Sequence, residues 1–216
     1  MQPYQHLDRV YCAGPLFNER ERQEMVEIAD VLEDAGFDPW GPHRDGMEFA
    51  QVHPYLVSSG YDYAYVGQLL HEAVFALDVY QVMLGCGSLV CNLNGRVPDE
   101  GAVSETSMAW SLGKPIVLYK DDVRTKIEGR DNPLVVGLTD FRTIKELRMI
   151  GPALQDRLDE LDLDPEFEHP FPHHLQEVLR AGDCLWSQLD QMGHERPAPE
   201  VAEIILELFG SKSAPA

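Results

Sequence analysis

Two carboxylates stand six residues apart in a stretch whose composition suits catalysis. Asp99 lies in a turn rich in Gly and Pro, and Glu105 opens an amphipathic segment. If a helix begins near Gly101, both acids face a crevice, and the helix N-terminus favours the ionised form of Glu105 at neutral pH. A fixed carboxylate at a pocket mouth can act as the nucleophile in glycosyl transfer. The alternative is an ordinary capping acid on a surface helix.

The stretch from residue 88 to residue 120 predicts the elements that would position these acids. It contains a short apolar run, a turn, about three turns of amphipathic helix and a second apolar run at residues 116–119. This pattern predicts a strand, loop, helix and strand, which is half of a parallel α/β sheet. In such sheets the loops at the carboxyl ends of the strands line the ligand crevice.

The N-terminal part predicts a second unit of the same kind. Residues 9–13 form an apolar strand that ends in the turn Gly14-Pro15, and Asn18 with Glu21 forms a capping box before a helix that Gly36 stops. The sequence has no Gly-x-Gly-x-x-Gly fingerprint and no Walker lysine here. A dinucleotide or triphosphate site is therefore not expected.

Two motifs carry a family resemblance. The pattern Asp99-x-Gly101-x-x-x-Glu105, followed by Ala109 and by Gly113-Lys114-Pro115, resembles the signature of the nucleoside 2-deoxyribosyltransferase family. The pattern Tyr11-x-Ala13-Gly14-Pro15-Leu16-Phe17 is similar to that family's first motif. Both occur in the family's order and at a similar separation, and the resemblance covers roughly residues 9–150. Two motifs together are more specific than either alone.

The resemblance implies roles for several of these residues. Glu105 would attack C1′ of a nucleoside to form a glycosyl-enzyme ester, and Tyr11 would donate a hydrogen bond that orients its carboxylate. Asp78 and Asp99 would contact the nucleobase, and Phe17 would stack on it. Gly14 and Gly101 would lie at the substrate site. Without the motifs, Tyr11 reads as a core residue, Gly14 as a turn residue and Asp78 as a surface acid of a helix.

Two further segments resemble parts of the family's substrate site. The loop that contains Arg44 and Asp45 is similar to a Pro-x-Arg-Asp-Gly segment that walls the site, although the two side chains could simply pair at a turn. Asn132 is the candidate for an Asn that family members borrow from a neighbouring subunit. The alternative for Asn132 is a turn-forming residue before Pro133.

The predicted fold is a doubly wound, mainly parallel five-stranded sheet of flavodoxin or Rossmann type, with helices on both faces. Residues 37–40 form its second strand, residues 64–84 an interrupted helix, and residues 134–138 a strand or interface segment. Residues 47–63 show no clean periodicity and predict a loop or lid. Residues 1–150 would form the enzyme domain. The acidic extension at 151–216 has 14 Asp plus Glu against 4 Lys plus Arg. Its pattern predicts helices at 173–192 and 200–209, which we expect to pack on the core or on a partner subunit.

Three functions remain open. The first is transfer of 2-deoxyribose between nucleobases by a retaining, ping-pong mechanism, with nucleosides and free bases as substrates and neither metal nor organic cofactor. The second is hydrolysis of nucleosides or their 5′-phosphates, although the turn Gly14-Pro15-Leu16 has no hydroxyl group for a phosphate. The third is a binding protein without chemistry, which would have no use for an unpaired nucleophilic acid.

The charge balance makes some classes of binding partner unfavourable. With 17 Lys plus Arg against 37 Asp plus Glu, the net charge of −20 disfavours nucleic-acid polymers and anionic membranes. No segment reads as a targeting or membrane-spanning sequence, so we expect a cytoplasmic protein, and by resemblance a homo-oligomer. We expect the four cysteines to be reduced thiols packed in apolar surroundings. We also expect three histidines to be solvated rather than to form a metal cluster, namely His169, His173 and His174.

Overall fold

The computed structural model describes residues 6–47, 49–95, 97–122, 131–161, 171–193 and 195–210. The chain forms two compact units, one of Met1–Gly41 and Val82–His169 and one of Pro42–Gln81 and Pro170–Ala216. The second unit is therefore assembled from two separate stretches of the sequence. The predicted domain boundary at residue 150 falls at the start of a helix that belongs to the first unit.

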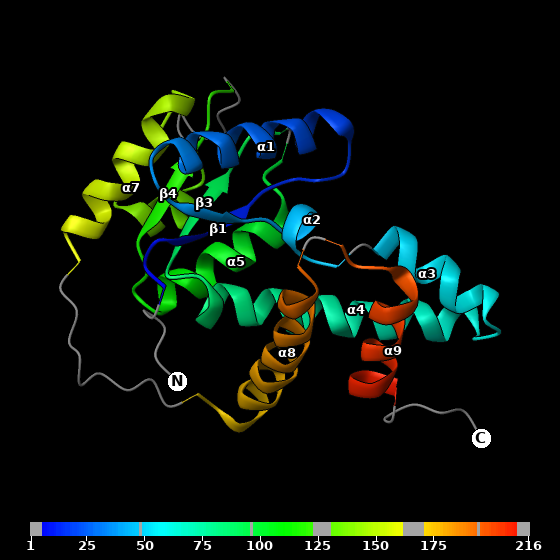
Figure 1. Cartoon of the computed structure of the whole chain (residues 1–216). Coiled ribbons are helices and arrows are strands. Elements are labelled where there is room, and N and C mark those ends of the chain that lie inside the picture. Colours follow the sequence, from blue (N-terminus) through cyan, green and yellow to red (C-terminus); the bar gives the residue numbers. More distant parts are fainter. Residues whose placement is uncertain are drawn as a thin grey trace. The chain divides into compact units, whose positions relative to one another are not determined.

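The first unit is built on a parallel sheet (Figure 1). Its strands are β1 (Arg9–Ala13), β2 (Asp38–Trp40), β3 (Ser88–Asn92) and β4 (Ile116–Tyr119). They are arranged in the order β2-β1-β3-β4, and all neighbours are parallel. This is an α/β architecture, in agreement with the predicted class, with four strands in the described part of the chain.

The prediction of a fifth strand is wrong for the described residues. The apolar run after Asn132 forms α6 (Pro133–Val136) and the 3₁₀-helix η2 (Gly137–Thr139). Asn132 caps this helix and Pro133 occupies its first turn, where a fixed φ and a missing N–H suit a helix start. Among the described residues beyond β4, one further bridge forms, between Tyr119 and Ile144.

Helices cover both faces of the sheet, as predicted for a doubly wound fold (Figure 1). Helices α1 (Glu19–Asp34) and α7 (Ile150–Asp159) pack on one face, and α5 (Glu100–Ser111) packs on the other. Side chains alternate along each strand, so Val10 and Cys12 join the core under α1 and α7 while Tyr11 between them faces α5. Alternation on β1 thus delivers Tyr11 to the face that carries Glu105.

Helix α1 begins and ends where its capping residues predict. The side chain of Asn18 accepts a hydrogen bond from Glu21 N, and the Glu21 carboxylate accepts one from Phe17 N at 2.9 Å. The predicted apolar face, Met25, Ile28, Ala29 and Leu32, is buried. Gly36 follows the helix with φ of +87°, a conformation that glycine adopts without steric cost.

The second unit is helical. It contains α2 (Pro42–Asp45), α3 (Phe49–Ser58), α4 (Tyr63–Tyr80), α8 (His173–Met192) and α9 (Ala198–Phe209). Helix α8 crosses α4 so closely that any side chain at Gly182 would clash with the carbonyl oxygen of Ala76. The absence of a side chain at Gly182 therefore permits this close crossing. The interruption predicted within the helix at residues 64–84 is the change from α4 to a π-helix, η1 (Gln81–Gly85).

The prediction of a loop at residues 47–63 is wrong, because most of this stretch forms α3. Val52 and Leu56 lie four residues apart and are both buried, which stabilises the helix through packing. Pro54 within it and Gly60 after it obscured that spacing in the sequence. No helix in the described ranges is long and apolar enough to cross a membrane.

Candidate functional site

The centre of the candidate site is a hydrogen bond between two elements of the first unit. The hydroxyl group of Tyr11, on β1, donates to Oε1 of Glu105, on α5, at 2.8 Å. The two residues are 94 positions apart in sequence, so only the folded sheet brings them together. Tyr11 is fully buried and Glu105 is partly buried. The expected contact between them is therefore present.

Asp99 determines where α5 begins. Its Oδ2 accepts a hydrogen bond from Ala102 N at 2.8 Å, which satisfies one of the free N–H groups of the first helical turn. Gly101 keeps this turn open, because a Cβ atom there would lie 3.2 Å from that oxygen. The helix starts at Glu100, close to the predicted position, and Glu105 follows in its second turn.

The protonation of Glu105 differs from the expectation. The pKa of Glu105 is raised to about 7. Burial is the main cause, the nearby charge of Asp99 also raises the pKa, and the hydrogen bond from Tyr11 lowers it. The prediction of a fully ionised Glu105 at neutral pH is therefore wrong. The helix N-terminus favours the charged form, but loss of hydration outweighs it. At neutral pH the carboxyl group is divided between its two protonation states.

The thiol below α5 takes no part in this titration. Cys91 lies on β3, and burial raises the pKa of its thiol to about 12. It therefore stays protonated at neutral pH. The cysteines at 12, 86, 91 and 184 are all free, and the first three are buried, as predicted. Cys184 is exposed on α8, so the prediction of a packed thiol is wrong for this residue.

Gly14 and Phe17 lie in the loop that connects β1 to α1. A side chain at Gly14 would clash with the sulfur of Met25, on α1, and approach Cβ of Asn92, on β3, at 3.0 Å, so glycine leaves room for both of these side chains. The side chain of Phe17 is 76% exposed. An aromatic ring exposed at the carboxyl edge of the sheet is free to contact a ligand.

A pocket of about 280 Å³ opens at the same edge of the sheet, on the side of α1. It is lined by Asn18, Arg20, Glu21, Glu24, Asn94, Gly95, Asp121 and Asp122. Four carboxylates face a single arginine, which disfavours anionic groups. None of the predicted site residues lines this pocket.

Sequence reasoning missed the residue that shapes the pocket, Asn94. Its Oδ1 accepts hydrogen bonds from the backbone N–H groups of Asp121 and Asp122, at 3.1 and 3.3 Å. The carboxylate of Asp122 in turn accepts from Gly95 N at 2.9 Å. The loops after β3 and β4 are thereby fastened together. The Asn94-Gly95 pair, separated from the end of β3 by one residue, was the available signal.

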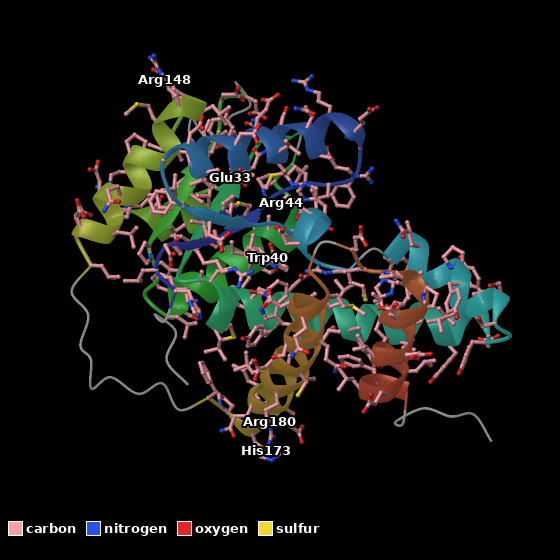
Figure 2. All side chains as sticks on the ribbon, viewed as in Figure 1. Glu33, Trp40, Arg44, Arg148, His173 and Arg180 are labelled. Atoms are coloured by element: carbon pink, nitrogen blue, oxygen red, sulfur yellow. The ribbon has the colours of Figure 1, made fainter. Side chains whose placement is uncertain are left out.

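The other predicted residues occupy several elements. Nε of Arg44 (labelled in Figure 2) and Oδ2 of Asp45 pair at 2.9 Å within α2, which is the simple pairing considered above. Asp78 is partly buried near the end of α4, between buried neighbours. These three residues belong to the second unit. In the first unit, Asn132 is exposed and accepts a hydrogen bond from Leu134 N at 3.0 Å.

Within the described ranges no cluster of three or more His, Cys, Asp or Glu side chains could hold a metal ion. His169 lies outside the described residues. His173 is exposed and lies 3.9 Å from a carboxylate oxygen of Glu177.

The first unit belongs to the class of open, parallel α/β sheets, in which ligands bind outside the carboxyl ends of the strands. Within that class, the family model for nucleoside 2-deoxyribosyltransferase matches residues 10–138, more than half of the chain. The chain therefore belongs to the nucleoside 2-deoxyribosyltransferase family.

The other comparisons add less. No curated protein matches the chain significantly. Among solved structures, the chain is similar to a conserved protein from Enterococcus faecalis V583, at 20% sequence identity and a TM-score of 0.49. That match covers 70% of this chain and 99% of the other.

Proposed function

We propose that this protein transfers a 2-deoxyribosyl group from one nucleobase to another through a covalent intermediate on Glu105. The observation that carries the proposal is the 2.8 Å hydrogen bond from Tyr11 to Glu105 in a member of this family. It holds a carboxylate in one orientation, with its second oxygen left to act on a sugar. No organic cofactor or metal is needed for this chemistry.

The reaction proceeds in two displacements. In the first, ionised Glu105 attacks C1′ of the nucleoside, the bond between C1′ and the base nitrogen breaks, and that nitrogen takes a proton from the acid that contacts the base. In the second, an incoming base attacks C1′ from the vacated face and returns a proton to that acid, the ester bond breaks and the Glu105 carboxylate is restored. Two inversions give overall retention and ping-pong kinetics.

A pKa near 7 suits these two steps. At neutral pH a substantial fraction of Glu105 is ionised and able to attack. A carboxylate of raised pKa is also more basic, which favours bond formation to carbon, whereas the ester must still release it in the second step. The Tyr11 hydroxyl group stabilises the departing carboxylate.

Asp99 and Asp78 are proposed to contact the nucleobase. The helix cap uses only Oδ2 of Asp99, so Oδ1 can accept from or donate to the base edge. Gly14, Phe17 and Gly101 would border the sugar and the base, and Arg44 and Asp45 would wall the site. Asn132 would act in the site of a neighbouring subunit, in a homo-oligomer that light scattering after gel filtration would detect.

A product assay tests the proposal. The protein is incubated with deoxyinosine and either adenine or cytosine, and the products are separated by chromatography. We expect a new deoxynucleoside, and we expect Glu105→Ala to abolish it. Glu100→Gln, which alters an exposed acid of the same helix, is the matched control and should retain the rate.

The other outcomes identify the alternatives. Hypoxanthine without a new nucleoside would indicate hydrolysis, and unchanged deoxyinosine with measurable binding would indicate a protein without chemistry. An undiminished rate in Glu105→Ala would remove Glu105 from the mechanism.

A further inference from the structure

The ring of Tyr11 packs against the ring of a second aromatic residue, Trp40, which is the last residue of β2. The two residues are register partners in the β1–β2 ladder. Their ring centroids lie 5.2 Å apart with an interplanar angle of 28°, which is a stacked arrangement. Trp40, labelled in Figure 2, is 1% exposed and Tyr11 is fully buried. The phenol ring is thus packed against the indole on the side of the sheet that α5 covers.

We propose that Trp40 is a positioning residue for the reaction, acting through Tyr11 to hold the phenol hydroxyl group against the Glu105 carboxylate. The inference rests on the proposed function for the part that concerns the rate. The other part, that Trp40 influences the pKa of Glu105 through Tyr11, does not depend on any activity.

The geometry explains why an aromatic partner is needed. A tyrosine on a strand has two common χ1 rotamers, and its hydroxyl group lies far enough from the backbone for a small rotation to break a hydrogen bond. The indole covers one face of the phenol ring, so Tyr11 cannot turn without losing the stacked contact. Because the indole is itself buried, it cannot move aside to allow the turn.

The consequence for Glu105 follows from the groups that surround it in the first unit. Tyr11 on β1 lowers the pKa of the carboxyl group, whereas burial and Asp99 at the helix start raise it. Cys91 on β3 contributes no charge near neutral pH, because its own pKa is about 12. Tyr11 is therefore the group that holds Glu105 in its ionised form. A change that lets the phenol move should raise the pKa of Glu105.

Three variants separate positioning from simple core packing. Trp40→Phe keeps an aromatic face against Tyr11, whereas Trp40→Leu and Trp40→Met keep a buried apolar side chain without one. Leu32→Ala is the control, because Leu32 is fully buried in the core on the opposite face of the sheet. It should cost stability without altering Glu105.

The first measurement does not require activity. Unfolding free energies are measured by urea denaturation between pH 5 and 9 for each variant, with and without Glu105→Gln. The difference within each pair reports the folded-state pKa of Glu105. We expect that pKa to rise by roughly one unit in Trp40→Leu and Trp40→Met, to remain nearly unchanged in Trp40→Phe, and to be unaffected in Leu32→Ala.

The second measurement is the pH dependence of kcat. In the aliphatic variants the acidic limb should move to higher pH, and the rate at neutral pH should fall by about fivefold with little change in KM. Trp40→Phe should restore most of the rate.

The outcomes distinguish the two proposals. If the aliphatic variants lose stability equally at all pH values and the pKa of Glu105 does not move, Trp40 is only a core residue and the inference is overturned. If the pKa moves but the unmodified protein transfers no sugar, the positioning role stands and the proposed function fails. Should Trp40→Leu not fold, Trp40→Met and Trp40→Phe provide the same comparison.

Discussion

Glu105 is subject to two opposing influences, and the balance between them sets its chemistry. Burial favours the neutral acid, and the hydroxyl group of Tyr11 favours the carboxylate. With a pKa of about 7, a small change in either contact alters the ionised fraction near neutral pH. The residue is therefore sensitive to its neighbours, and two predictions at this scale follow from that sensitivity.

Replacing Tyr11 by Phe removes the donor and keeps the ring. The pKa of Glu105 should rise, so the acidic limb of the pH–rate profile should move to higher pH. The rate at neutral pH should fall by roughly 10- to 100-fold. Tyr119→Phe is a suitable control, because Tyr119 is buried in the core on the other face of the sheet. A Tyr11→Phe profile that matches the unmodified protein would contradict the role given to the phenol.

Glu105→Gln should change the pH dependence of stability. The folded-state pKa of Glu105 is raised, so its contribution to stability is present below the unfolded pKa and is lost as the pH rises through about 7. The glutamine variant should therefore be more stable than the unmodified protein at pH 8.5, by about 1–3 kcal/mol, and the gain should shrink towards pH 5. Urea denaturation at the two pH values measures this. An equal difference at both would mean that burial does not penalise the charge.

At the scale of elements, the start of α5 is the feature that aims Glu105. Asp99 fixes the first turn through its hydrogen bond to Ala102 N, and Gly101 leaves room for that bond. The helix then carries Glu105 over β1, where Tyr11 meets it. Asp99 thus has a structural task in addition to its proposed contact with the base.

Two substitutions at Asp99 should separate capping from charge. Asparagine is an equally good N-cap, whereas alanine removes the cap and should cost about 1 kcal/mol of stability. Both remove the negative charge that raises the pKa of Glu105, so the acidic limb should move to lower pH in both. Thermal unfolding and pH–rate profiles measure the two effects.

Asp62→Ala provides the matched control, because Asp62 caps α4 in the same way. It should reduce stability without altering the profile of Glu105. Equal losses of stability in Asp99→Asn and Asp99→Ala would show that Asp99 does not stabilise the protein by capping α5.

Elements with strong local signals could be predicted from the sequence. The strand at residues 9–13, the cap at Asn18 and the long helix α8 all agree with the structure. Helix α3 could not, since Pro54 interrupts its pattern and burial of Val52 and Leu56 stabilises it. The apolar run after Asn132 resembled a strand because hydrophobicity alone does not distinguish a short buried helix from a strand.

The candidate site was predicted in part. The contact between Tyr11 and Glu105 followed from the resemblance, since nothing local to either residue indicates the other. The pKa of Glu105 could not be predicted, because it depends on burial by residues distant in sequence. Trp40 was assigned only to a strand, and its stacking on Tyr11 depends on the register of β1 against β2.

At the scale of the whole molecule, the net charge of −20 is the dominant property. Mutual repulsion among acidic side chains destabilises the compact state, and dissolved ions screen it. Raising NaCl from about 0.02 M to about 0.5 M should therefore increase the melting temperature by roughly 2–5 °C. Differential scanning calorimetry measures this shift. A melting temperature that falls with salt would mean that attractive surface ion pairs outweigh the repulsion.

The crossing of α8 over α4 has a consequence for biosynthesis. Ala76 and Gly182 meet in the folded protein, yet the ribosome makes them about one hundred residues apart, which corresponds to roughly 5–20 seconds of translation. During that interval the apolar face of α4 has no α8 to cover it. A nascent chain that stalls before residue 170 should accordingly recruit chaperones or aggregate. Once synthesis has passed residue 193 and α8 has left the ribosome, α8 can pack against α4.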